Sequence, residues 1–304
     1  MNLNAPKQVT VRVPATTANC GPGFDAIGMA CSLYNEVGLA YSDTDKIIVN
    51  GLGTHLPRDG RNIAWQAVQS VFERLGQKAP PLALTLTNNI PLSHGLGSSA
   101  AAIVGGLFAA NVIAGNQLIH QDILDMATKR EGHPDNVAPA IFGGICISVM
   151  QTDEVKTLKF APPNGLQLVA AIPDFNLPTR LARSVLPTRI SMQDAVFNLS
   201  RTALLVGSLA KGELDFLEYA LDDKLHQPYR RKLIPGMDDA FAAARTNGAF
   251  GATISGAGPT LTAYTTRNAD AIGQSMVDAF IKNGKNATYQ VLSIDCQGTT
   301  IVSE

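Results

Sequence analysis

The stretch from Pro91 to Ala101 constrains the fold of this chain more than any other segment. An alternating apolar run at 82–87 precedes it and is typical of a strand that ends near Asn88. A run rich in Ala, Val, Ile and Leu, at 100–114, follows it and predicts a well-buried helix. Glycines allow close approach of a ligand to the backbone, and a helix start offers unpaired N–H groups at its positive dipole end. The stretch therefore predicts a phosphate-binding loop.

Two other phosphate-binding patterns fit this loop less well. Residues 95–100 match the dinucleotide fingerprint, but a dinucleotide unit would open the domain and carry an acidic residue about 20 positions on, at a strand end. The acidic residues there, Asp122 and Asp125, lie on the polar face of a predicted helix. A Walker loop needs a lysine directly after the glycines, and the nearest ones, Lys78 and Lys129, are far away. A dinucleotide-dependent enzyme that transfers hydride stays open as a less favoured alternative.

The composition narrows the class of protein. The chain has 304 residues, 45% of them hydrophobic, and 24 Lys and Arg nearly balance 25 Asp and Glu. No basic cluster indicates nucleic acid binding, and the most apolar predicted helix is too short to span a bilayer. Residues 1–7 lack the order of a signal peptide, and the four cysteines lie far apart, which is typical of reduced thiols. We expect a soluble cytoplasmic protein.

The remaining pattern predicts a mixed fold. Strands are expected at 8–16, 29–40, 46–50, 145–150, 156–161, 166–173, 248–254, 261–265 and 287–295. Helices are expected at 62–75, 119–130, 191–210, 213–221, 236–246 and 268–282. Residues 137–144 are expected to lead into the strand at 145–150. Because strict strand–helix alternation is missing, we predict a two-layer α+β fold. A polar patch at 151–156 predicts two domains, 1–155 and 156–304.

Three loops, taken in order, resemble those of one enzyme family. They are Pro14–Asp25 with its Asn-x-Gly-x-Gly-Phe-Asp ending, Pro91–Ala101, and the Ser-Gly-Ala-Gly-Pro-Thr turn at 255–260. This set resembles the galactokinase, homoserine kinase, mevalonate kinase and phosphomevalonate kinase (GHMP) family. Segments 11–19, 131–139 and 228–236 resemble the homoserine kinases within it. The resemblance implies an N-terminal domain like ribosomal protein S5 domain 2, a ferredoxin-like C-terminal domain, and ATP with Mg²⁺.

The resemblance also implies a nucleotide site. By this likeness, ATP contacts Asn62, Pro91, Leu92, Ser93, His94, Gly95, Leu96, Gly97, Ser98, Ser99, Ala100 and Ala101. Ser98 and Glu131 would hold Mg²⁺, which prefers oxygen ligands. Two plainer interpretations stay open: Glu131 as a solvated helix-end carboxylate and Asn62 as a simple helix cap. A zinc site from His133 and Asp135 lacks a convincing third ligand.

On the substrate side, the resemblance implies homoserine, which carries an ammonium, a carboxylate and a hydroxyl. Arg183 and Arg230 match the carboxylate-binding arginines, although Arg231 is adjacent to the second. The residues matched to the amine and hydroxyl end are Asn19 and Asp25, with His133 lining the same pocket. The catalytic residues implied are Asp25, Ser98 and Glu131. The resemblance also implies a homodimer.

Two further readings of the family resemblance stay open. One is a GHMP kinase for another small alcohol, such as a mevalonate-type acid or shikimate. The other is a non-catalytic binding protein with the GHMP fold, against which the presence of Ser98 and Glu131 speaks. Some relatives place a lysine in the first strand beside an aspartate base, whereas this chain has Arg12 and Pro14 there. No dedicated base is therefore predicted, and Asp25 is expected to orient the hydroxyl.

Overall fold

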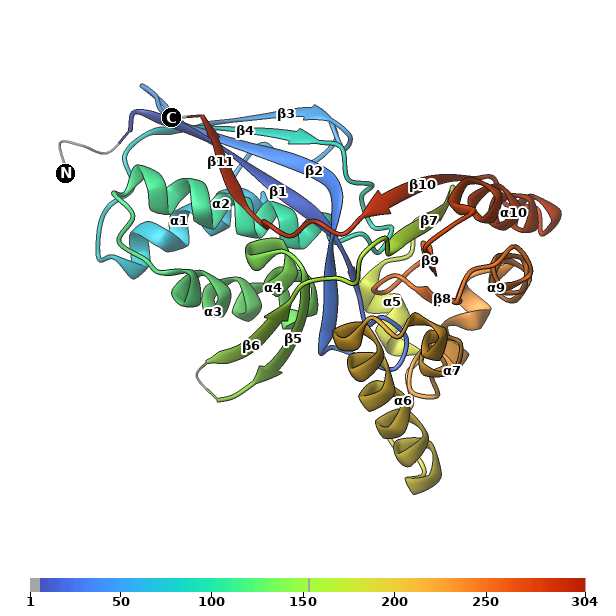
Figure 1. Cartoon of the computed structure of the whole chain (residues 1–304). Helices are drawn as coiled ribbons and strands as arrows, with labels where there is room; N and C mark the ends of the chain where they lie inside the picture. The colour runs from blue at the N-terminus through green and yellow to red at the C-terminus, as the bar shows by residue number, and fades with distance from the viewer. Residues whose placement is uncertain (1–5, 153, 304) are drawn as a thin grey trace.

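The structure is a computed structural model that describes residues 6–152 and 154–303 and folds them around two β-sheets (Figure 1). The strands of the first sheet are β1 (Gln8–Ala18), β2 (Ile27–Tyr41), β3 (Lys46–Gly51), β4 (Leu82–Asn88), β5 (Ile145–Met150), β6 (Val155–Phe160) and β11 (Thr300–Ser303). Strand β2 is the longest of them and pairs with β1 along its length. It pairs with β4 at one end, over 36–41, and with β5 at the other, over 27–29.

Four helices cover one face of the first sheet (Figure 1). They are α1 (Ile63–Arg74), α2 (Ser98–Ile113), α3 (His120–Glu131) and α4 (Pro134–Phe142). Helix α2 is buried on nearly every side, because it lies between the sheet and the other helices. Two adjacent glycines make this possible. A Cβ on Gly105 would come within 2.4 Å of a Val37 methyl group on the sheet, and one on Gly106 within 2.5 Å of the Ala64 carbonyl oxygen in α1.

Gly106→Ala should therefore destabilise the protein, although alanine is the better helix former. The added methyl group meets backbone that cannot move aside, and overpacking of this kind costs about 1–3 kcal/mol. Gly207→Ala is the matched control, because Gly207 lies in helix α6 (Met192–Lys211) with nothing near its missing Cβ. The control should stabilise by about 0.5–1 kcal/mol, and urea unfolding measures both. Effects of the same sign would contradict the tight contact between α1 and α2.

The second sheet is antiparallel throughout and runs β10-β7-β9-β8. Its strands are β7 (Gln167–Pro173), β8 (Gly251–Ile254), β9 (Leu261–Thr265) and β10 (Ala287–Ser293), and its covering helices are α9 (Met237–Thr246) and α10 (Ala269–Lys282). Alternate residues of β7 enter two different cores, as the period of a strand requires. Leu168 and Ala170 belong to the core shared with the first sheet, and Val169 and Ala171 belong to the core beneath α9 and α10. The two halves are thus joined by packed side chains.

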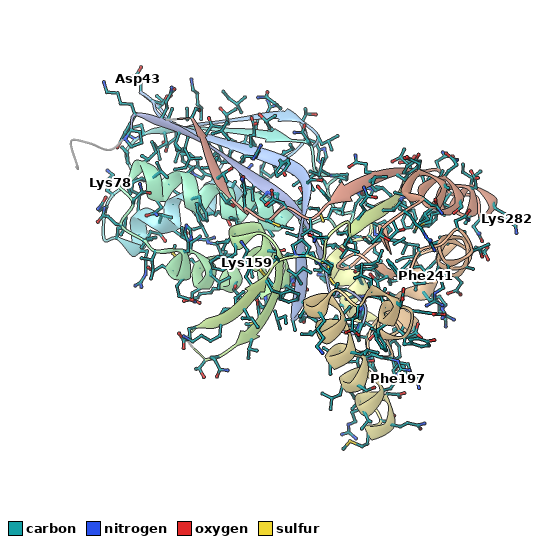
Figure 2. All side chains as sticks on the ribbon, viewed as in Figure 1. Asp43, Lys78, Lys159, Phe197, Phe241 and Lys282 are labelled. Atoms are coloured by element: carbon teal, nitrogen blue, oxygen red, sulfur yellow. The ribbon has the colours of Figure 1, made fainter. Side chains whose placement is uncertain are left out.

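One long helix, α6, and several short ones fill the connection between β7 and α9. They are α5 (Thr179–Ser184), α6, the 3-10 turn Leu214–Phe216, α7 (Leu217–Ala220), α8 (Gln227–Arg230) and the 3-10 turn Arg231–Leu233. Figure 2 shows Phe197 on α6, which projects from the body of the molecule, and Phe241 on α9. Within the described ranges, no helix combines the length and hydropathy that a bilayer crossing needs. In the structure the four cysteines are free, with Cys20, Cys31 and Cys146 buried and Cys296 exposed, and their reduced state stays a prediction.

The chain changes sheet later than the composition indicates, and then returns. Strand β6 pairs with β5, so the step to the second sheet comes between Phe160 and Gln167. The last strand, β11, pairs with β1 of the first sheet. Lys159 of β6 lies at this junction (Figure 2), where its ammonium donates to the carbonyls of Phe142 and Cys296. The division into domains 1–155 and 156–304 stays a prediction. The sheets depart from it in two places, because β6 still belongs to the first sheet and β11 returns to it.

One predicted loop is a helix. From the sequence we predict that a helix stops at the segment containing Gly132 and Pro134, and we predict no further helix before the strand at 145–150. In the structure, Gly132 ends α3 in the left-handed conformation, and Pro134 then begins α4. Proline suits a first helical position, because its fixed φ is helical and its missing N–H has no partner to lose there.

Candidate active site

The glycine-rich loop lies between β4 and α2, as predicted. Gly97 has a left-handed φ of 72° and serves as the N-cap of α2, so the helix begins at Ser98. Among the residues that the structure describes, no side chain caps this helix start. The N–H groups of its first turn therefore remain available to an anion, which the helix dipole also favours.

Two other loops hold the glycine-rich loop in place. A Cβ on Gly95 would come 2.1 Å from the Ser255 carbonyl oxygen, and one on Gly97 would come 2.0 Å from the Thr16 hydroxyl oxygen. The Ser255 hydroxyl donates to the Gly95 carbonyl at 2.6 Å, and the Thr16 N–H donates to the Leu96 carbonyl at 3.1 Å. The turn at 255–260 therefore packs directly against this loop. Glycine is required at both positions for close approach as well as for φ.

Two cavities meet at the loop. The larger, of about 590 Å³, has a mostly apolar wall. Its apolar side chains are Leu52, Leu56, Ile63, Leu86, Leu92 and Ala102. The smaller, of about 140 Å³, is the polar cleft. The polar cleft is lined by Asn19, Asp25, Ser98, Ser99, Glu131, His133, Asp135, Arg183 and Arg230, among others. Both cavities share Pro91, Ser93, His94, Ser98 and Ser99, so a ligand in one can reach the other across the loop.

Most of the predicted nucleotide residues line one or both cavities, and three of them line neither. Asn62 lies at the larger cavity, and its amide oxygen also caps α1 by accepting the N–H groups of Ala64 and Trp65. The capping reading is therefore confirmed, and contact with adenine stays a prediction. Leu96, Ala100 and Ala101 are buried in the core and line neither cavity. Only their backbone is available to a nucleotide.

The acidic wall of the polar cleft comes from the end of α3 and the start of α4. The Ser99 hydroxyl donates to the Glu131 carboxylate at 2.9 Å, so the structure brings Glu131 to Ser99 rather than to Ser98. Burial raises the pKa of Glu131, and the Ser99 hydrogen bond only partly offsets it. His133 lies 2.5 Å from the Asp135 carboxylate. Burial alone lowers the pKa of His133, but Asp135 and the nearby carboxylates raise it overall.

The basic wall comes from the second half of the chain. Arg183, on α5, makes two hydrogen bonds to the Asp25 carboxylate, at 2.7 and 3.0 Å. The hydrogen bond to Asp25 raises the pKa of Arg183. Arg230, on α8, is 1% exposed, and burial together with Arg183 lowers its pKa to about 10. Arg231 is exposed and pairs with Asp238 at 3.2 Å, away from the cleft. The structure thus places Arg230, and not Arg231, at the predicted site.

Asn19 organises the loop that carries Asp25. Its amide N–H donates to the Gly256 carbonyl at 2.8 Å, and its amide oxygen accepts the Asp25 N–H at 2.9 Å. Both Asn19 and Asp25 have positive φ, which loop residues adopt only when their surroundings hold them there. Asn19 lines the cleft as predicted, and its side chain also fixes the position of Asp25.

One buried polar residue beside the cleft was not predicted. His226 is fully buried at the start of α8 and contacts Arg230. Phe24 stacks on its ring with centroids 5.2 Å apart. In the sequence, this histidine stands in a polar loop with no periodicity to mark it as buried. Only the fold reveals it.

The comparisons with known proteins agree with this geometry. The model of the GHMP kinases N terminal domain matches residues 62–144, and that of the GHMP kinases C terminal region matches residues 205–282. A homoserine kinase from Moorella thermoacetica is 45% identical over 293 residues, which cover 96% of this chain and 99% of the relative.

The chain belongs to the GHMP kinase family.

Other similar proteins within the GHMP kinases carry the same description. A homoserine kinase from Desulfitobacterium hafniense is 44% identical over 97% of this chain and 100% of its own length. The crystal structure of a homoserine kinase from Cytophaga hutchinsonii has a TM-score of 0.90 at 32% identity, with 98% of both chains covered. The predicted family, its homoserine kinase branch and the α+β GHMP fold are confirmed. As GHMP kinases use ATP, the glycine-rich loop is the part of this chain to which a nucleotide is expected to bind.

Proposed function

We propose that this protein transfers the γ-phosphoryl group of ATP to the side-chain hydroxyl of L-homoserine. The oxygen–phosphorus bond to ADP breaks, a bond to the substrate oxygen forms, and the hydroxyl proton is released. One observation carries the proposal: a small polar cleft with two arginines opposite carboxylates adjoins a larger apolar cavity across a helix N-terminus. The homoserine kinases to which the chain is similar support it.

The two cavities suit the two substrates. The larger, apolar cavity would take adenine and ribose, with Asn62 and the Pro91 side of the loop at its edge. The triphosphate would then run along the N–H groups at the start of α2, where Ser98 and Ser99 line both cavities. The γ-phosphate would reach the polar cleft, where the hydroxyl of homoserine would be bound. Transfer of a phosphoryl group depends mainly on such in-line placement and on charge stabilisation.

The polar cleft suits a zwitterion. Arginine is a strong hydrogen-bonding partner of carboxylates, and Arg183 and Arg230 both line the cleft. The ammonium would lie near Asp25 and Asn19, with His133 beside it. Arg183 and Asp25 form an ion pair with each other. An amino acid offers each of them a new partner of opposite charge, whereas a mevalonate-type acid has no ammonium for Asp25.

The donor set around Glu131 fits Mg²⁺. Among the described residues, Glu131 accepts a hydrogen bond from Ser99 and forms no ion pair, and its raised pKa shows that burial disfavours its charge. A hard cation held by carboxylate and hydroxyl oxygens would relieve that cost. Glu131 and Ser98 would hold the ion. When bound, Mg²⁺ neutralises phosphate charge.

The chain's own residues supply orientation rather than a dedicated base. Arg12 of β1 lies over the Tyr34 ring at 4.6 Å, outside both described cavities. Asp25 would orient the substrate hydroxyl, and the fixed N–H groups at the α2 start would stabilise the charge of the transition state. A homodimer and a cytoplasmic location, which buried reduced thiols suit, remain part of the proposal.

The proposal is tested by ADP release from Mg-ATP over a panel of alcohols. L-Homoserine should stimulate release well above mevalonate, shikimate and 4-hydroxybutyrate. Release stimulated by none of them would support the non-catalytic alternative, and binding of NAD in place of Mg-ATP would support the hydride-transfer alternative. Failure of L-homoserine to stimulate ADP release contradicts the proposal.

Arg230→Ala is expected to separate the two substrates. Loss of a charged hydrogen bond to the carboxylate should raise KM for homoserine about tenfold to a hundredfold, while KM for ATP stays within about twofold. Arg231→Ala is the matched control, because that side chain is exposed and faces Asp238. It should leave both constants unchanged. Equal effects of Arg230→Ala on both substrates would show that Arg230 does not bind the carboxylate.

A further inference from the structure

His226 stands between a substrate-binding arginine and the loop that carries Asp25. Its ring is fully buried, with Nε2 2.8 Å from the Gly21 carbonyl oxygen and Nδ1 3.1 Å from Nη1 of Arg230. Phe24 stacks against the ring, and the guanidinium groups of both cleft arginines lie 5.4 to 5.6 Å from the Phe24 centroid. The histidine therefore contacts both Arg230 and the loop that carries Asp25.

The two partners of His226 fix its proton. A carbonyl oxygen only accepts, so Nε2 must carry the hydrogen that Gly21 receives. A guanidinium only donates, so Nδ1 must be the unprotonated acceptor for Arg230. The ring is thereby held neutral in the Nε2–H form. Burial lowers the pKa of His226, in agreement with this state.

Asp223 does not compete for this ring. Its carboxylate accepts the N–H groups of Leu225, His226 and Gln227 and the side-chain amide of Asn198, at 2.6 to 2.9 Å. The carboxylate is thus occupied in capping the start of α8. Its nearest approach to His226 Nε2 is 3.6 Å.

The contacts of Arg230 leave one nitrogen free. Its Nε donates to the Ala182 carbonyl at 3.1 Å, and Nη1 donates both to the Gly256 carbonyl at 2.9 Å and to His226. These bonds use every hydrogen on Nε and Nη1. Within the described chain, Nη2 makes no hydrogen bond, and Arg230 lines the cleft. An arginine so restrained presents its free nitrogen in a single direction.

We propose that His226 is a positioning residue that aims Nη2 of Arg230 into the polar cleft and so sets the affinity for the amino acid carboxylate. This rests on the proposed function, in which Arg230 binds that carboxylate. Without the acceptor at Nδ1, Nη1 keeps one unused hydrogen, and only the bonds to Ala182 and Gly256 remain to hold the guanidinium in its orientation. In other enzymes, a shift of a positioning group by about 1 Å lowers activity by up to about a hundredfold. The loop connection through Gly21 keeps the ring itself in place.

Two substitutions divide the roles of the ring nitrogens. In His226→Asn, the amide oxygen stands near the position of Nδ1 and can still accept from Arg230, but the contact with Gly21 is lost. In His226→Gln, the amide nitrogen reaches the position of Nε2 and can donate to Gly21, but Arg230 loses its acceptor. Each variant gives up one hydrogen bond, so a purely structural role predicts similar losses of thermal stability and activity for both.

The proposal predicts that the two variants differ. His226→Gln should raise KM for L-homoserine about tenfold to a hundredfold and leave KM for ATP within about twofold, whereas His226→Asn should raise KM for homoserine less than about threefold. Equal changes in the two variants, or equal changes for ATP and homoserine, overturn it. A wild-type protein that is inert toward L-homoserine would instead contradict the proposed function.

A second measurement needs no variant. In ¹⁵N-labelled wild-type protein, the nitrogen shifts and couplings of His226 report which ring nitrogen carries the proton. The expected result is a neutral ring protonated at Nε2 in both the free and the homoserine-bound protein. A ring protonated at Nδ1, or at both nitrogens, would overturn the proposal, because Arg230 would then have no acceptor.

Discussion

Glu131→Gln is expected to lower kcat about a hundredfold to a thousandfold while the protein stays as stable as the parent or becomes more stable. The substitution keeps the size and the hydrogen bond from Ser99 but removes the charge that is proposed to hold Mg²⁺. Because burial raises the pKa of Glu131, the folded protein holds a proton there more strongly than the unfolded chain. Such a group contributes stability below its unfolded pKa and loses it as pH rises through the folded pKa. Glutamine carries no charge at neutral pH, so the Glu131→Gln variant avoids that loss of stability.

The combination of lost activity and retained stability separates a functional carboxylate from a structural one. Steady-state kinetics at saturating ATP and homoserine gives kcat, and thermal unfolding without nucleotide or metal gives stability. Glu154→Gln is the matched control, since that side chain is exposed and pairs with Lys156 at the surface. A variant at 131 that keeps kcat, or that unfolds much more easily than the parent, would show that Glu131 serves the fold alone.

The sequence predicted the loops of the site better than the contacts between them. Strand β4, the glycines and helix α2 follow from local pattern, because alternation, chain breaks and apolar runs are properties of neighbouring residues. The pairing of Asp25 with Arg183 joins residues 158 positions apart, and no local pattern encodes it. The same holds for Arg230 and Arg231. They are adjacent in sequence, and only the packing of α8 against Ala182 and Gly256 decides which one is buried.

The missed elements have physical reasons. Helix α4 begins directly at a proline, and Pro139 lies inside it, so propensity argues against a helix that tertiary burial enforces. Strand β11 is short and exposed, and its pairing with β1 depends on a chain that leaves the second sheet and returns. From the sequence alone, Ser98 and Ser99 are equivalent candidates for contact with Glu131. The turn of the helix places the hydroxyl of Ser99 toward Glu131 and buries Ser98.

Asp25→Asn is expected to lower kcat with saturating L-homoserine about a hundredfold or more. Asp25 pairs with Arg183. In the proposed complex, Asp25 would exchange this partner for the substrate ammonium as Arg183 takes the carboxylate, so the number of paired charges would be preserved. Asparagine can still donate or accept a hydrogen bond, but it leaves Arg183 without a counter-charge in the empty site and the ammonium without one in the complex. Asp222→Asn, which alters an exposed pair with Arg245, should change nothing measurable.

Substrate analogues with one charge test the exchange of partners directly. 4-Hydroxybutyrate keeps the carboxylate and 3-aminopropan-1-ol keeps the ammonium, so each opens the Asp25–Arg183 pair and restores only one partner. Both should be used far less well than homoserine by the parent. In Asp25→Asn, the advantage of homoserine over 4-hydroxybutyrate should shrink, because the ammonium no longer finds its carboxylate. If Asp25→Asn retains the parent kcat and the parent discrimination, Asp25 neither orients the hydroxyl nor holds the ammonium, and the pair with Arg183 serves only to close the empty cleft.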